Sequence, residues 1–150
     1  MLERATEMRL ATVDREGWPY VVPLTFVFDD GKIFFHTGME DGHLSTNLEA
    51  EHRVCIEVDE PGPAFSTGST GCGVSRVFES VIAFGRAKVL TDRNEKASFF
   101  DGLLDKYADP NWGLTREYPR LDNARVFQID IELMTGKRRL RPEQLTILSG

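Results

Sequence analysis

The sequence predicts a mostly β, α+β domain, in which six antiparallel strands form a small barrel with two or more short helices inserted between them. Runs rich in β-branched and aromatic residues recur along the chain, with turn residues between them. Two other segments follow helical spacing. No strand-like run is followed by a glycine-rich dinucleotide or triphosphate loop. Together these observations favour an antiparallel barrel over a doubly wound sheet.

The first three strands are predicted in the N-terminal quarter of the chain. Met8 to Val13 and Trp18 to Phe28 are rich in β-branched and aromatic residues, and Asp14 to Gly17 between them has turn chemistry. Asp29-Asp30-Gly31 is a second turn, because Asp-Gly supplies the positive φ that a tight hairpin requires. Lys32 to Thr37 is then the third strand.

A short helix and a fourth strand follow. Leu44 and Leu48 have helical spacing in a segment that reaches His52, and Arg53 to Asp59 alternates apolar and polar residues as a half-buried strand does. From Glu60 to Ser75 the chain is dominated by Pro, Gly, Ser and Thr. We expect a loop there because of this composition. A loop of this length in a compact domain is usually functional or mobile.

The C-terminal half supplies two more strands and a second helix. Arg76 to Leu90 is the longest strand-like run, and Gly85 within it indicates a bulge or a barrel corner. Asp92 and Glu95 form a capping-box pattern for a helix that ends before Pro110. Ala124 to Leu133 alternates cleanly and is predicted to close the sheet.

Composition excludes several kinds of partner. The 150 residues carry a net charge of -6, so nucleic acid would be repelled over most of the surface. The apolar runs are too short to span a membrane, and charges between Leu2 and Arg9 are atypical of a secretory leader. Two cysteines, Cys55 and Cys72, make no disulfide framework. We therefore expect a single cytoplasmic domain over residues 1–150.

The stretch HTGMEDGHLSTNL, His36 to Leu48, is a candidate ligand site. Its histidines and Glu40 could bind a metal, but no further Cys or His cluster accompanies them, so we predict none. A phosphate fits better, because the start of a helix offers free N–H groups and Gly42 lets a ligand approach the backbone. His43 would add a donor. His36 is either a neighbour of the phosphate or a packed core residue.

Several short segments occur in a characteristic order. They are Leu10 to Val13, Trp18 to Leu24, Phe34 to Thr37, Asn47-Leu48, Arg53 to Cys55, Phe78 to Val81, Phe84-Gly85 and Thr135 to Arg138. With this order and spacing, the chain from about Ala5 to about Arg139 resembles the pyridoxamine 5'-phosphate oxidase-like FMN-binding split-barrel family. It is most similar to the branch that includes nitroimidazole-resistance proteins. The resemblance implies a six-stranded split barrel with Greek-key character.

The resemblance also implies an obligate homodimer, with FMN in a groove between the two subunits. The flavin ring or ribityl chain would meet Val22, Pro23, Leu24 and Thr25. The phosphate end would meet His36, Thr37, Gly42, His43, Leu44 and Asn47. Two further residues complete the predicted site: Ser80, where a partner-strand side chain meets the flavin, and Lys137, where a cationic C-terminal residue approaches it.

The chain departs from pyridoxamine phosphate oxidases proper in two places. Gly42-His43-Leu44 stands where they have an Arg-Lys pair, and Leu133 to Arg141 lacks their tryptophan-containing strand and Arg-Leu-His end. The residues that grip pyridoxal phosphate are thus not recovered, which argues against vitamin B6 oxidation.

The resemblance predicts an FMN-dependent oxidoreductase that passes electrons from a reduced nicotinamide donor to a small-molecule acceptor. The cofactor carries that chemistry, so no protein residue is assigned a catalytic role. The alternatives are a non-catalytic protein that binds or stores flavin, haem or a deazaflavin on the same fold, and a dimer that has lost its ligand. A haem would require His36 or His43 as axial ligand.

Overall fold

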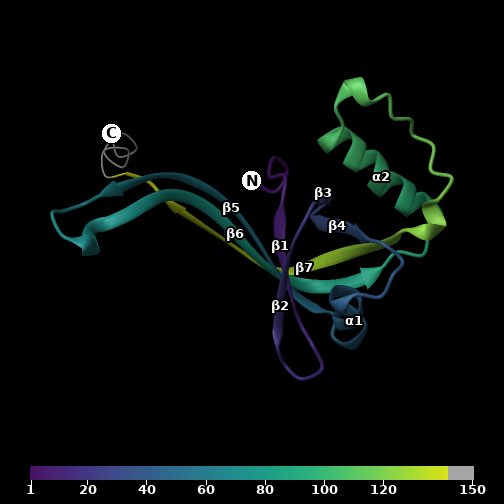
Figure 1. The fold of residues 1–150 in the computed structure, drawn as a ribbon, viewed down its shortest axis with the longest axis horizontal. Helices are drawn as coiled ribbons and strands as arrows, with labels where there is room; N and C mark the ends of the chain where they lie inside the picture. The colour runs from purple at the N-terminus through teal and green to yellow at the C-terminus, as the bar shows by residue number, and fades with distance from the viewer. Residues whose placement is uncertain (142–150) are drawn as a thin grey trace.

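The computed structural model describes residues 1–141, which form a seven-stranded antiparallel sheet with two α-helices (Figure 1). The order of strands across the sheet is β2-β1-β5-β6-β7-β4-β3, so β2 and β3 form its two edges. Three short 3-10 helices lie at Gly71–Gly73, Pro110–Trp112 and Leu121–Asn123. The main elements are β1 (Met8–Val13), β2 (Pro19–Leu24), β3 (Val27–Asp29), β4 (Lys32–Thr37), α1 (His43–Ala50), β5 (Arg53–Ser66), β6 (Val74–Val89), α2 (Arg93–Tyr107) and β7 (Arg125–Arg139).

The mostly β fold is confirmed, but the prediction of six strands was wrong by one. The run Trp18 to Phe28 is two strands, because β2 pairs with β1 whereas β3 pairs with β4. The break is at Phe26, whose side chain is fully buried and whose N–H donates to Tyr107 Oη at 3.1 Å. A side chain of α2 thus replaces the ladder at this point. The predicted turn at Asp30-Gly31 is confirmed, with φ of 45° and 73°.

The predicted loop from Glu60 to Ser75 was also wrong, since most of it is strand. β5 continues to Ser66 and β6 starts at Val74, so the two form a long hairpin with Cys72 exposed at its tip. A register shift between Pro61 and Ala64 accommodates the Pro-Gly-Pro sequence within the strand. With the end of β7, the hairpin makes a curved three-stranded arm that projects from the barrel (Figure 1).

Two predictions about the C-terminal half are confirmed. The ladder between β6 and β7 shifts register at Gly85, where a Cβ would lie 2.3 Å from the carbonyl oxygen of Asp130. Only glycine fits this close approach of two backbones. Asp92 caps α2 and accepts hydrogen bonds from the N–H groups of Asn94 and Glu95 at 2.8 and 2.9 Å.

The sheet has an inner face, which holds the main core, and an outer face. Residues buried on the inner face include Met8, Leu10, Ile56, Val58 and Ala83. A row of residues in register crosses the outer face from β2 to β7; it consists of Val21, Ala11, Cys55, Phe84 and Leu133. A smaller core of Leu90, Phe99 and Val126 lies between α2 and the sheet. Within residues 1–141, neither helix has the length and apolar character needed to cross a membrane.

Candidate functional site

The start of α1 offers hydrogen-bond donors to an anion. Gly42 is the residue before the helix and supplies no side chain to cap it, so the first-turn N–H groups keep their capacity for a ligand. A Cβ at Gly42 would meet no atom of the described residues within 4 Å, so these leave the space next to the backbone open. The first turn carries no acidic residue. These features suit a phosphate, which is attracted by the free N–H groups and the helix dipole.

His43 lies at this helix start and also contacts the edge strand. Its exposed ring stacks on Tyr20 of β2, with ring centroids 5.6 Å apart and an interplanar angle of 27°. The predicted phosphate residue His43 is therefore adjacent to the strand predicted to carry the flavin. Thr37 ends the strand that leads to α1, and its hydroxyl donates to the carbonyl oxygen of Gly38 at 3.0 Å.

Arg125 is a cationic residue near the helix start that sequence reasoning missed. It pairs with Thr37 in the ladder between β4 and β7. Its Nη2 lies 3.1 Å from Asp41 Oδ1, its Nη1 lies 3.6 Å from Glu49 Oε1, and its side chain is 18% exposed. Asp41 lies just before the helix start, and Glu49 lies in the last helical turn. Because Arg125 contacts both carboxylates, it fixes the position of α1 on the sheet. Arg125 lies 82 residues after His43 in the sequence, so no local motif connects it to the helix start.

Asn47 and Leu44 hold the same helix from within the core. Asn47 is 3% exposed, and its Nδ2 donates to Thr12 Oγ1 of β1 at 3.0 Å. Thr12 Oγ1 in turn lies 3.5 Å from the carbonyl oxygen of Tyr20. Leu44 is buried in the main core. The amide of Asn47 is thus engaged within the chain, and both residues act on the position of the helix start.

His36 lies apart from His43. Its ring packs against Phe99 and Phe100 of α2, with centroid distances of 5.6 and 5.4 Å. Its Nδ1 is buried and has no hydrogen-bond partner among residues 1–141, and burial lowers the pKa of the imidazole. Of the two roles that the sequence left open, the structure favours the packed residue.

The predicted flavin residues of β2 lie on both faces of its edge strand. Val22 and Leu24 are opposite buried Leu10 and Met8 and so point inward, whereas Pro23 is opposite Arg9 and points outward. A proline is tolerated here because an edge strand has one unpaired side. Thr25 follows the strand and borders an apolar hollow of about 300 Å³; its other lining residues are Phe100, Leu103, Leu104, Tyr107, Ala108, Trp112, Leu114 and Tyr118.

Ser80 and Lys137 lie directly opposite each other in the β6–β7 ladder. Alternation along the strands places both on the outer face, with Phe84 and Leu133 further along the same two strands. They belong to the arm, which projects away from α1 in Figure 1. One chain therefore brings Ser80 and Lys137 together, and brings Thr37, Gly42 and His43 together, but leaves the two groups apart.

A hollow of about 440 Å³ opens at the outer face beside the apolar row. It is lined by Ala11, Thr12, Val13, Asp14, Pro19, Glu51, Arg53, Val54, Cys55 and Phe84. Ala11, Cys55 and Phe84 belong to both features, and 46% of the surface of Phe84 is exposed. No residue in this hollow was predicted for the site, because side chains spread over β1, β2, β5 and β6 give no contiguous sequence signal.

Comparison with known proteins agrees with this architecture. The model of the pyridoxamine 5'-phosphate oxidase family matches residues 1–138. No curated protein matches the chain. Among solved structures, a proposed 5-nitroimidazole antibiotic resistance protein from Bacteroides thetaiotaomicron is 26% identical, with a TM-score of 0.72 over 89% of this chain and 76% of that one.

Two further structures show the same fold at lower identity. The flavocytochrome Anf3 from Azotobacter vinelandii is 21% identical, with a TM-score of 0.79 over 94% of this chain and 65% of that one. An FAD-binding protein from Mesorhizobium loti is 24% identical, with a TM-score of 0.67 over 93% and 90% of the two chains. The split-barrel fold is thereby confirmed, and the chain belongs to the pyridoxamine 5'-phosphate oxidase family.

Proposed function

We propose that the protein binds FMN and passes electrons from a reduced nicotinamide donor through it to a small-molecule acceptor. The observation that carries the proposal is the start of α1, where uncapped N–H groups, open space at Gly42 and the exposed ring of His43 fit a phosphate. The FAD-binding protein and the flavocytochrome of the same fold support a flavin as the ligand. Bound FMN would supply the electron-transfer chemistry.

The residues of this chain would then bind and orient the flavin. His43 and the first turn of α1 would hold the phosphate, and Arg125 and Asn47 would hold α1 itself. The exposed Pro23 and Thr25 would lie along the ring or the ribityl chain. Lys137 would place a positive charge near the ring, and Ser80 a hydroxyl. None of these residues is required as a nucleophile.

The proposal includes a homodimer with two equivalent flavin sites. Val21, Phe84 and Leu133 of the outer-face row are 58%, 46% and 57% exposed, which is a large apolar surface for one small domain to leave in water. A second copy on this face would bury the row. Ser80 and Lys137 lie on the same face, and in the proposed dimer they would meet the α1 group of the partner.

A cytoplasmic setting is part of the same proposal. Cys55 and Cys72 are free thiols, Cys55 half-buried in β5 and Cys72 exposed at the hairpin tip. Burial and the charge of Glu57 raise the pKa of the Cys55 thiol, which favours its protonated form. Free thiols are typical of a reducing compartment.

Spectroscopy of the purified protein tests the proposal. We expect flavin absorption bands, or their appearance with a spectral shift when FMN is added, followed by bleaching when NADPH or NADH is added under anaerobic conditions. Flavin binding without bleaching by either nucleotide would support storage instead. A Soret band on addition of haem, with no uptake of FMN, would overturn the flavin proposal.

A further inference from the structure

We propose that Arg4 is a positioning residue for the flavin site, and that it acts by fixing the arm where Ser80 and Lys137 lie. This inference rests on the proposed function. It concerns the N-terminal strap, defined as Met1–Glu7, whose Leu2 and Ala5 side chains are 6% and 9% exposed in the main core. The strap is therefore an integral part of the barrel, and Arg4 projects from a fixed base.

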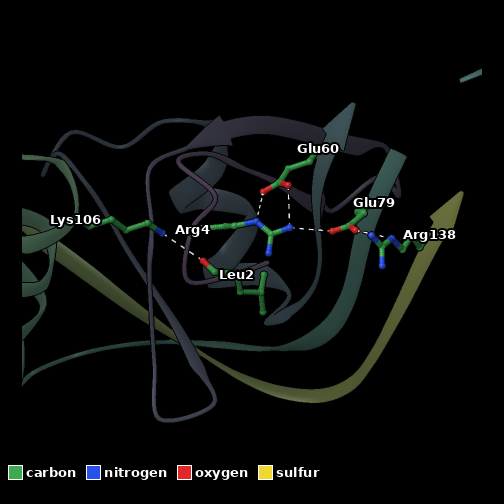
Figure 2. Close-up of polar contacts among 6 residues, drawn as sticks. All are labelled: Leu2, Arg4, Glu60, Glu79, Lys106 and Arg138. Carbon is green, nitrogen blue, oxygen red and sulfur yellow. Dashed lines mark hydrogen bonds and ion pairs between the residues drawn. The ribbon is translucent and has the colours of Figure 1, made fainter. Parts of the chain in front are cut away.

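Arg4 joins two strands of the arm through a four-residue ionic network (Figure 2). Its Nε and Nη2 donate to Glu60 of β5 at 2.8 and 2.9 Å, and Nη2 also donates to Glu79 of β6 at 2.9 Å. The other oxygen of Glu79 lies 2.8 Å from Arg138 Nε of β7. The hydrogen bond from Arg4 holds the pKa of the Glu60 carboxyl below its usual value.

The ionic network lies where the arm no longer pairs with β1 or β4. The ladder from β1 to β5 reaches Glu57, and the ladder from β4 to β7 reaches Asp130. Beyond these residues the arm continues as β5, β6 and β7, and Glu60 is three residues past the end of the β1 ladder. A narrow ribbon twists more freely than a wide sheet. Arg4 therefore ties the ribbon to the barrel close to its root.

The register of β5, β6 and β7 relates the ion pairs of Arg4 to the predicted flavin site. Glu60, Glu79 and Arg138 are opposite one another across the three strands, and the adjacent row is Asp59, Ser80 and Lys137. Because neighbouring residues of a strand point to opposite faces, the ionic row lies on the inner face and the Ser80–Lys137 row lies on the outer face. The strap thus holds the inner side of the ribbon segment whose outer side carries Ser80 and Lys137.

The other side of the strap is tied to the exit of β2. Lys106 of α2 donates to the carbonyl oxygen of Leu2 at 3.4 Å (Figure 2). The same Nζ donates to the carbonyl oxygen of Phe26 at 3.0 Å and lies 3.8 Å from the centroid of the Phe26 ring. Phe26 follows Thr25 directly. The strap consequently links the β2 end of the site to the arm.

Exposed ion pairs contribute little one at a time, so the geometry of this network matters. Arg4 is 55% exposed on its side chain, and a single pair there would be weak. A guanidinium that contacts Glu60 through two nitrogens and also reaches Glu79 fixes direction as well as distance. The expected effect of its loss is a displaced arm, with a small change in overall stability.

The test compares R4Q, E79Q, K137Q, the double variant R4Q/K137Q and the control R116Q. Arg116 also contacts two carboxylates, those of Asp101 and Asp105, but on α2 and not on the arm. For each protein, the Kd for FMN and the midpoint potential of bound FMN are measured, and circular dichroism reports folding. R4Q and E79Q should raise the Kd about 3- to 10-fold and shift the potential in the same direction as K137Q. R116Q should match the wild type.

The double variant R4Q/K137Q should show no further shift in potential than K137Q alone, because Arg4 acts on the potential through Lys137. Additive shifts, or an R4Q protein with the affinity and potential of the wild type, would overturn the inference. If R4Q does not fold, E79Q decides, since it breaks the same bridge from the arm. If the wild type and R116Q bind no FMN, the proposed function fails, and this inference fails with it.

Discussion

The ring of His43 stacks on the ring of Tyr20, and this contact joins the start of α1 to the edge strand β2. Three other contacts fix the same helix. Asn47 bonds to Thr12, and Arg125 contacts both Asp41 and Glu49. The helix start is thus held against β2 and β1 through Tyr20 and Thr12, and against β7 through Arg125, and a fixed helix start suits a phosphate site.

His43→Ala should weaken FMN binding by about 1 to 2 kcal/mol, or about 5- to 30-fold in Kd, because it removes a donor to the phosphate. A fluorescence-quenching titration measures the change. His52→Ala is the matched control, because His52 Nδ1 contacts the carbonyl oxygen of Leu48 at the other end of α1. An affinity equal to that of the control would remove His43 from the phosphate site.

Arg125→Gln should destabilise the protein by about 1 to 3 kcal/mol, because a largely buried guanidinium is lost and Asp41 and Glu49 lose their partner. Urea denaturation measures the free energy of unfolding. In the control Arg53→Gln, an ion pair with Glu51 is lost from a side chain that is 69% exposed, and the loss of stability should be clearly smaller than in Arg125→Gln. Equal losses in the two variants would show that Arg125 does not brace α1.

His36 should make the folded state less stable in mild acid. Burial lowers its pKa in the folded protein, so below the ordinary histidine pKa the unfolded chain binds a proton that the folded chain does not. The free energy of unfolding is therefore unaffected by His36 above the ordinary histidine pKa. It decreases as the pH falls below that pKa, because only the unfolded chain is protonated there.

His36→Phe removes this titrating group and keeps an aromatic ring beside Phe99 and Phe100. The free energy of unfolding, measured by urea denaturation at about pH 8 and about pH 5.5, should then fall less in the variant than in the wild type. The same fall in both proteins would mean that other groups cause the acid sensitivity.

Phe84→Asp should convert the proposed dimer to monomers, because it places a charge in the exposed apolar row of the outer face. Light scattering after size-exclusion chromatography measures the mass. Val89→Asp is the control in the same strand, with a side chain of similar exposure, 47%, outside the row. A dimeric Phe84→Asp protein would place the interface elsewhere.

Local sequence signals predicted most elements and failed where distant contacts decide. The cap at Asp92 and the turn at Asp30-Gly31 depend on neighbouring residues, and both were predicted correctly. The break at Phe26 depends on Tyr107, 81 residues away, and could not be seen in the run Trp18 to Phe28. The Pro-Gly-rich segment from Glu60 reads as a loop, because nothing local shows that β6 pairs with it.

The residues of the candidate site also fall into those with a local sequence signal and those placed by distant contacts. The start of α1 has a local signature in Gly42-His43, and the structure has the predicted helix there. The bracing role of Arg125 arises from the pairing of β7 with β4, so no local sequence motif predicts it. His36 was ambiguous because its environment is made by α2, which follows it by more than fifty residues.

Subunit complementation tests the central claim, that α1 of one subunit and the arm of its partner form each flavin site. His43→Glu and Lys137→Glu proteins, each weakened in FMN binding, are mixed, allowed to exchange subunits, and titrated with FMN. If the sites are shared between subunits, mixed dimers regain one intact site, and about a quarter of all sites should bind with wild-type affinity. No recovery of tight binding after complete exchange would contradict the account.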